Sequence, residues 1–167
     1  MAQGPGLPHQ ARWLGPIALA LAACCLAAGP AAAGSPGDFA SNLATFAYDK
    51  ALDKAREEKK LTFVYFWTPS CPYCREFSDA VLGDPDVLES LGRYFVVVSV
   101  NADRERKLSR KFRLPSVPYL AFLDSSGQVV SIIPGAVARD FFLVYLEYLR
   151  TGAYSDQEFR AFVESLT

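Results

Sequence analysis

The chain has 167 residues, of which 51% are apolar, and this length suits one globular domain with a substantial core. Seventeen basic and eighteen acidic side chains give a net charge of -1, which argues against a nucleic-acid-binding protein, because such proteins are normally basic. The single histidine, His9, lies in a leader that we expect to be removed. Without it, a catalytic triad, a Cys-His protease and a histidine zinc site are excluded, and we expect no metal and no cofactor.

Residues 1–33 have the features of an export signal. Arg12, with no acidic residue beside it, precedes an apolar stretch over residues 13–26, and residues 31–33 are the small alanines that a signal peptidase accepts. We expect cleavage after Ala33, which predicts a periplasmic protein with a single domain over residues 34–167. Only two cysteines remain after that cleavage, Cys71 and Cys74.

Two other interpretations of the leader stay open. The run Leu21-Ala22-Ala23-Cys24 is similar to the lipobox of bacterial lipoproteins, which predicts a leader of residues 1–23, a lipid on Cys24 and a membrane-anchored lipoprotein. An uncleaved membrane span is less favoured, because glycine and proline pairs interrupt a run that is already near the lower length for a span.

The first half of the body predicts a helix, a strand and a second helix. Residues 38–60 carry apolar side chains at i, i+4 spacing, which predicts an amphipathic helix. Residues 61–67 are a continuous aromatic and β-branched run, typical of a central strand that is covered on both faces. Residues 68–70 break the strand, and residues 71–81 predict a helix with Pro72 in its first turn, where a missing N–H costs little.

The second half predicts more strands and helices in alternation. The pattern predicts strands over 94–100, 119–123 and 129–133, the last two joined in a hairpin by a turn at 124–127. It predicts a short helix over 84–91, a charged helix over 103–112 and an amphipathic helix over 139–150 that ends at Gly152. Residues 155–166 predict a docked final helix, which begins with a capping box of Ser155 and Glu158.

The chemistry concentrates in the run Cys71-Pro72-Tyr73-Cys74. Two cysteines separated by two residues at a helix start can close a small disulfide ring, with Cys71 exposed and Cys74 one turn further in. Free N–H groups and the helix dipole at that position favour a thiolate on Cys71. The spacing therefore predicts reversible redox chemistry, in which Cys71 attacks a client disulfide and Cys74 resolves the mixed disulfide.

Two alternatives compete with this redox centre. Half a zinc site is disfavoured, because the body offers no further cysteine or histidine as a ligand. A structural disulfide in a non-enzymatic client-binding module stays open, although so short a loop adds little stability.

The order of these elements, with Phe66-Trp67 before the cysteines and Val117-Pro118 before a strand, resembles the thioredoxin superfamily over residues 38–150. The closer resemblance is to exported proteins of the SoxW type, which share the Cys-Pro-Tyr-Cys centre and the Asp-Pro-Asp-Val segment at 84–87. The resemblance implies a thioredoxin-like α/β fold: a central mixed β-sheet flanked by helices, with extra N-terminal and C-terminal helices.

The resemblance also implies roles for individual residues. Cys71 would be the nucleophile, Cys74 the resolving thiol and Pro118 a cis proline facing them, and the Val117 backbone would bind an extended client. We assign substrate binding to the residues nearest the pair: Trp67, Pro72, Tyr73, Val117 and Pro118. One departure is Tyr65, which stands where cytosolic thioredoxins carry a buried aspartate and implies a narrower client range.

Taken together, these features predict an exported thiol:disulfide oxidoreductase of the protein-disulfide reductase type. We expect a monomer that acts on protein thiols and disulfides, with clients in sulfur oxidation or cytochrome c maturation. Its electrons would come from a membrane thiol carrier of the DsbD or CcdA type, and no nucleic acid is expected as a partner.

Overall fold

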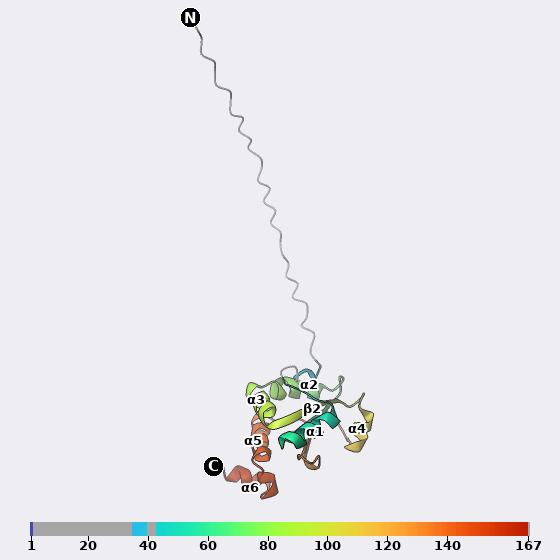
Figure 1. Cartoon of the computed structure of the whole chain (residues 1–167), viewed down its shortest axis with the longest axis vertical. Helices are drawn as coiled ribbons and strands as arrows, with labels where there is room; N and C mark the ends of the chain where they lie inside the picture. The colour runs from blue at the N-terminus through green and yellow to red at the C-terminus, as the bar shows by residue number, and fades with distance from the viewer. Residues whose placement is uncertain (2–34, 40–42, 167) are drawn as a thin grey trace. The chain divides into compact units, whose positions relative to one another are not determined.

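The structure is a computed structural model that describes Met1, residues 35–39 and residues 43–166 (Figure 1). The predicted cleavage site after Ala33 and the predicted lipidation site at Cys24 lie outside the described residues. In the part that is described, none of the helices combines the length and the apolar character needed to cross a membrane.

A four-stranded mixed sheet forms the centre of the domain, in the order β2-β1-β3-β4. β1 pairs in parallel with β2 and antiparallel with β3, and β3 and β4 form an antiparallel hairpin. β1 is therefore an interior strand, which confirms the prediction from its continuous apolar run. The strands are β1 (Leu61–Trp67), β2 (Phe95–Asn101), β3 (Tyr119–Leu123) and β4 (Val129–Pro134).

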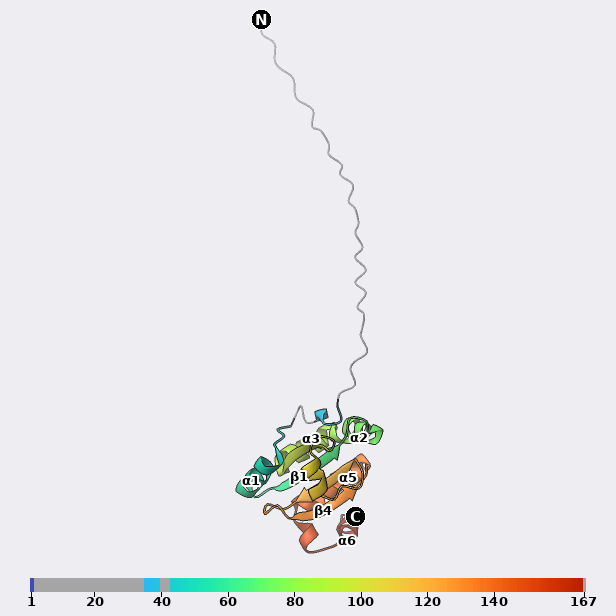
Figure 2. The ribbon, with the colours of Figure 1, turned by 90° about the vertical axis from the view of Figure 1, so that its right-hand side faces the viewer.

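Helices cover both faces of this sheet, and Figure 2 shows the strands lying between α1 and α5. The α-helices in the described residues are α1 (Tyr48–Glu58), α2 (Pro72–Phe77), α3 (Pro85–Tyr94), α4 (Arg106–Lys111), α5 (Arg139–Arg150) and α6 (Phe159–Glu164). A π-helical turn, η2 (Ser78–Leu82), continues α2, and a 3-10 turn, η3 (Ala153–Ser155), follows α5. The thioredoxin-like α/β fold that the sequence predicts is thus confirmed.

The side chains of the sheet alternate between two buried layers, as the period of a strand requires. On one face Phe63 and Tyr65 pack with residues of α2, α3 and α5, among them Phe142. On the other face Val64 packs with α1 and α4, and Ala51 of α1 is completely buried there. The continuous apolar run of β1 therefore fills two cores at once, and this holds the carboxyl end of β1 firmly beneath α2.

The first helix is shorter than the spacing predicts. We expected it over residues 38–60, but α1 begins only at Tyr48, and residues 40–42 lie outside the described residues. Thr45 pairs with β2 in an isolated parallel bridge, which keeps this part of the chain extended. Phe39 packs on the face of the sheet opposite to α1. The apolar i, i+4 spacing over residues 38–60 therefore does not mark one helix, because its residues belong to two faces of the sheet.

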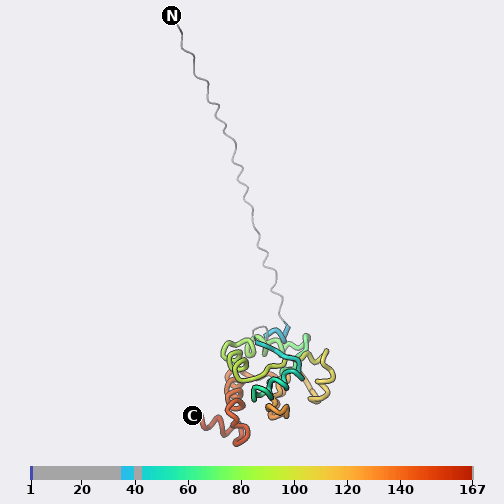
Figure 3. Tube along the Cα trace, viewed as in Figure 1, coloured from blue at the N-terminus to red at the C-terminus, as the bar shows by residue number. Residues whose placement is uncertain are grey.

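The last helix begins later than the capping box predicts. Ser155 lies in η3, and α6 starts after Glu158, whose side chain makes no capping hydrogen bond. The predicted start is wrong because Gly152, at φ 78°, turns the chain into η3 first. Figure 3 shows the chain changing direction near its C-terminal end, after the long helix α5. The tail still docks on the domain through Phe162, which is 7% exposed, but Leu166 at its end is exposed.

Candidate active site

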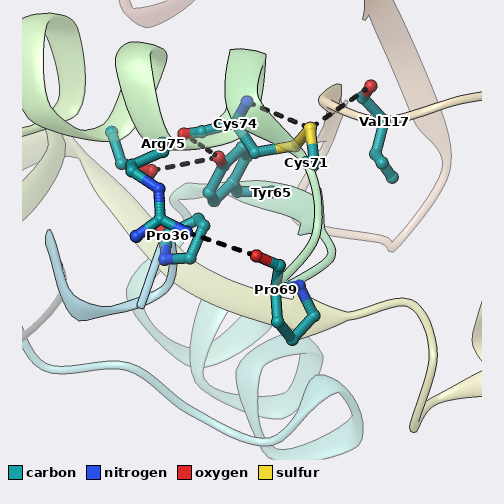
Figure 4. The surroundings of a disulfide bond; sticks show 8 residues. Pro36, Tyr65, Pro69, Cys71, Cys74, Arg75 and Val117 are labelled. Atoms are coloured by element: carbon teal, nitrogen blue, oxygen red, sulfur yellow. Dashed lines mark hydrogen bonds between the residues drawn. A yellow bond between two sulfur atoms is a disulfide. The ribbon is translucent and has the colours of Figure 1, made fainter. Parts of the chain in front are cut away.

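Cys71 and Cys74 form a disulfide at the start of α2 (Figure 4). Cys71 is the N-cap residue of the helix in extended backbone, and Pro72 takes the first helical position. The backbone N–H of Cys74 donates a hydrogen bond to Cys71 Sγ over 3.0 Å. An N–H at a helix start therefore points at this sulfur, an arrangement that favours negative charge on it when the disulfide is open.

The two sulfurs differ in how far they can be reached. Cys71 is 8% exposed and Cys74 is completely buried, whereas Tyr73 between them is 67% exposed. The sequence predicts an exposed Cys71, and the structure covers it more than that, but it is still the more accessible of the pair. A client approaching this end of the sheet would meet Cys71 and Tyr73 first.

The loop before β3 lies against the disulfide. The Val117 carbonyl oxygen is 3.7 Å from Cys71 Sγ (Figure 4). The Val117–Pro118 peptide bond is cis. Pro118 is buried, while Val117 is half-buried. The chain thus places the backbone of Val117 next to the first cysteine, although these residues are 46 positions apart.

Trp67 lies beside the site with its polar atom already occupied. Its indole N–H donates to Ser99 Oγ over 2.9 Å, and its ring packs at the edge of the core layer that holds the disulfide. Gly37 covers the ring so closely that a Cβ on this glycine would lie 2.5 Å from it. Trp67 therefore supports the end of β1 from within.

Tyr65 occupies a buried polar position beneath α2, where its hydroxyl donates to the Cys74 carbonyl oxygen over 3.0 Å (Figure 4). The same hydroxyl lies 3.0 Å from Ser78 Oγ, which in turn donates to the Pro36 carbonyl oxygen over 2.5 Å. Burial raises the pKa of Tyr65 to about 12. The phenol is thus a neutral hydrogen-bonding group that joins β1, α2 and the N-terminal residues.

Sequence reasoning identified Tyr65 only as a departure from a family pattern and missed both Ser78 and Pro36. One signal was present, because Ser78 lies four residues after Cys74 and so shares its face of the helix. No pattern in the sequence indicated Pro36, since its contact joins positions 42 residues apart.

The comparison with protein families fits this architecture. A family model described as a thioredoxin-like domain matches residues 48–150, from the start of α1 to the end of α5. The chain belongs to this family. The stretch contains the cysteine pair, Trp67, Val117 and Pro118, whereas Pro36 and Gly37 lie before it.

Solved structures give the same result. A thioredoxin from Thermus thermophilus is 33% identical, with a TM-score of 0.59 over 65% of this chain and 87% of that one. A thioredoxin-fold protein from Helicobacter pylori is 18% identical, with a TM-score of 0.60 over 65% of this chain and 84% of that one, and shows the fold alone.

A curated relative matches a smaller stretch. "Protein disulfide isomerase-like 5-3" from Oryza sativa subsp. japonica is 33% identical over 76 residues, which is 46% of this chain but 18% of that protein. Together with the Cys71–Cys74 disulfide, the family fits a thiol-disulfide oxidoreductase. Among the described residues, no group of three or more His, Cys, Asp and Glu side chains is placed to hold a metal ion.

Proposed function

We propose that this protein is an exported thiol:disulfide oxidoreductase that reduces or exchanges disulfides of client proteins through Cys71 and Cys74. The observation that carries the proposal is the position of this disulfide, at the start of α2 and 3.7 Å from the Val117 carbonyl oxygen. A disulfide at a helix start beside an accessible loop is suited to exchange with another disulfide.

The reductive half-reaction starts from the dithiol form. The Cys71 thiolate attacks one sulfur of the client disulfide, the client S–S bond breaks, and the other client sulfur leaves as a thiolate. Cys74, after losing its proton, then attacks Cys71 Sγ, which releases the second client sulfur as a thiolate. Two electrons have passed to the client, and the protein holds the disulfide seen in the structure.

Client binding would use the residues around the pair. The Val117 backbone would pair with an extended client segment, and exposed Tyr73 would cover the client from the α2 side. Pro72 and Pro118 would shape the two sides of the approach to Cys71. Trp67 would support the site from the core side, because its N–H is already bonded to Ser99 and is not free to bind the client.

The partners and the compartment belong to the same proposal. The leader of residues 1–33 supports export to the periplasm, with lipid anchoring through Cys24 as the alternative. We propose that the protein is a monomer whose electrons come from a membrane thiol carrier of the DsbD or CcdA type. The SoxW-like Cys-Pro-Tyr-Cys centre supports sulfur-oxidation clients, with cytochrome c maturation proteins as the second class.

Insulin-disulfide reduction tests the proposal. Cys71→Ser should abolish turnover, whereas Cys74→Ser should form mixed disulfides with the client that cannot be resolved and that survive on a non-reducing gel. Ser155→Ala, which removes an exposed hydroxyl in η3, is the control and should retain turnover. Normal turnover in both cysteine variants would contradict the proposal.

The reduction potential separates the reductase from a structural disulfide, the alternative that the low exposure of Cys71 favours. A value near about -270 mV supports a reductase, and a value near about -120 mV supports a disulfide donor. A pair that stays oxidised down to about -300 mV supports a client-binding module with an inert disulfide. Equilibration with dithiothreitol buffers measures it directly.

A further inference from the structure

A strongly basic segment, residues 103–113, follows β2. It carries six Lys or Arg and two Asp or Glu side chains, a net charge of +4. The rest of the described residues carries ten basic and sixteen acidic side chains, a net charge of -6. The charges of this nearly neutral protein are therefore unevenly distributed along the chain, with a positive excess in the segment that contains α4.

The positive charges of the segment are exposed and lack carboxylate partners. In residues 35–39 and 43–166, no carboxylate lies within ion-pair distance of any of them, whereas Arg139 and Arg150 elsewhere are paired. Leu108 and Phe112 turn inward to the core, which leaves the charges outside. The six exposed basic residues are Arg104, Arg106, Lys107, Arg110, Lys111 and Arg113.

The segment is attached to the candidate active site at both of its ends. Just before it, the Ala102 N–H donates to the Trp67 carbonyl oxygen over 2.8 Å, at the end of β1 that leads to the cysteines. Just after it, residues 114–116 lead to Val117, whose carbonyl oxygen lies 3.7 Å from Cys71 Sγ. The two ends of the segment therefore adjoin the strand and the loop that flank Cys71, whereas Lys107 and Lys111 line a hollow beside α1.

Arg113 has a backbone conformation that glycine would adopt more easily. Its φ is 48°, in the left-handed region, and its N–H donates to the Arg110 carbonyl oxygen at the end of α4. Glycine is the usual residue at such a helix end, and a side chain there is unfavourable. Arg110 and Arg113 line an open hollow of about 360 Å³ together with Ala102, Ser109 and Leu114.

We propose that residues 103–113 select clients that are acidic next to the reacting cysteine, an inference that rests on the proposed function. An extended client segment beside Val117 would place Asp or Glu side chains at Arg110 and Arg113. The acidic remainder of the surface repels the same client elsewhere, so the field of the whole protein directs the client toward Cys71.

Exchange with matched peptide disulfides tests this inference. The reduced full chain reacts with three peptides that are identical except for two residues beside their cysteine, which are both Glu, both Gln or both Lys. We expect the Glu peptide to react about fivefold to tenfold faster than the Lys peptide at low salt, because each exposed charge contact contributes modestly. The preference should shrink toward 1 M salt, where the screening length falls to about 3 Å.

Arg113→Gly is the most informative variant, because it removes one positive charge from the segment. It also places glycine at a left-handed backbone position, which glycine adopts without strain. The ratio of Glu to Lys peptide rates should fall about threefold, and the thermal midpoint should hold or rise. Lys59→Gly is the matched control, since Lys59 is also left-handed, at φ 54°, but lies before β1, at the end opposite the cysteines. It should leave the ratio unchanged, and an unchanged ratio in Arg113→Gly and Arg110→Gln would overturn the inference.

A binding measurement keeps the inference testable if redox activity is absent. The double variant Cys71→Ser, Cys74→Ser should bind a cysteine-free Glu peptide more tightly than the Lys peptide in fluorescence anisotropy. If the protein exchanges no peptide disulfide but binds the Glu peptide more tightly than the Lys peptide, the redox proposal is wrong. The inference that residues 103–113 select an acidic partner is then still supported. Equal binding of both peptides, or sedimentation with phosphatidylglycerol vesicles without any peptide preference, would overturn it.

Discussion

The Tyr65 hydroxyl donates a hydrogen bond to the Cys74 carbonyl oxygen over 3.0 Å, so the strand that leads to the candidate site also holds the helix that carries it. The hydroxyl of Ser78 lies 3.0 Å away and donates to the Pro36 carbonyl oxygen. The two hydroxyl groups thus make three close oxygen contacts, although they have only two protons to donate. These contacts join β1, α2 and the N-terminal residues. Hydrogen bonds of this kind matter most when buried, because water cannot replace them.

Tyr65→Phe should make the protein less sensitive to alkaline pH. Burial raises the pKa of Tyr65 to about 12 from about 10, so the folded state holds the phenol proton more tightly. That stabilisation is fully present below about pH 10 and is lost as pH rises toward 12, on the order of 2 to 3 kcal/mol. The free energy of unfolding in urea, measured from neutral pH to about pH 11, should fall more steeply in the wild type than in the variant.

The matched control is Tyr73→Phe, because this tyrosine belongs to the same helix but is 67% exposed. It should keep the steep alkaline loss of the wild type. If Tyr65→Phe and Tyr73→Phe gave parallel pH curves, the buried phenol would not be the source of the effect. At neutral pH we expect Tyr65→Phe to cost about 1 to 3 kcal/mol, since it leaves buried polar atoms with fewer partners.

Gly37→Ala should loosen the N-terminal residues from the candidate site. A Cβ at this position would lie 2.5 Å from the indole ring of Trp67, and the ring has little room to move because its N–H is bonded to Ser99. We expect a loss of about 1 to 3 kcal/mol in the free energy of unfolding, as for other overpacked sites. Trp67 fluorescence should shift to the red as water reaches the ring.

Gly92→Ala provides the comparison for that variant. A Cβ there would meet only the methyl end of Leu43, a flexible side chain, at 2.9 Å. Because Gly92 lies within α3, alanine should offset the contact through its better helix propensity, by up to about 1 kcal/mol. A red shift of the emission in Gly92→Ala, or its absence in Gly37→Ala, would show that Gly37 does not seat Trp67.

Features that are set by neighbouring residues could be predicted from the sequence, whereas features that depend on contacts between distant residues could not. The interior position of β1 and the placement of Cys71 at a helix start follow from local patterns, the apolar run and Pro72 after the cysteine. The start of α1 could not be predicted, because Thr45 is held extended by its bridge to Val97, which is distant in sequence. Charge clusters need the fold for the same reason, since only the topology joins the ends of residues 103–113 to the end of β1 and to the Val117 loop.

Arg139→Gln should weaken the contact between α3 and α5 in a pH-dependent way. Arg139 Nε donates to Asp84 Oδ2 over 2.6 Å, and this hydrogen bond lowers the pKa of Asp84, which is also the N-cap residue of α3. A lowered folded pKa stabilises the protein above the unfolded value of about 3.9, and the benefit is lost as pH falls through the folded value. The stability difference between wild type and variant should therefore be present at neutral pH and shrink below about pH 4.

Asp84→Asn and Asp84→Ala separate the charge from the cap in thermal melts. Asparagine keeps an oxygen for the N–H groups of Asp86 and Val87 but loses the pairing with Arg139, whereas alanine loses both. We expect the thermal midpoints to fall in the order wild type, Asn, Ala at neutral pH. Equal midpoints for the two variants would mean that the cap contributes nothing.

Thr62→Val should stabilise the protein. Thr62 is completely buried in β1, between Val96 of β2 and Leu123 of β3, and within the described residues its hydroxyl oxygen has no hydrogen-bond partner. An unpaired buried hydroxyl costs free energy, and valine has nearly the same shape without it, so we expect a gain of about 1 kcal/mol in urea unfolding. Thr62→Ser keeps the hydroxyl and removes a methyl group, and should lose about 1 kcal/mol instead. A loss in both variants would mean that the hydroxyl is paired and that its removal, like that of the methyl group, weakens the core.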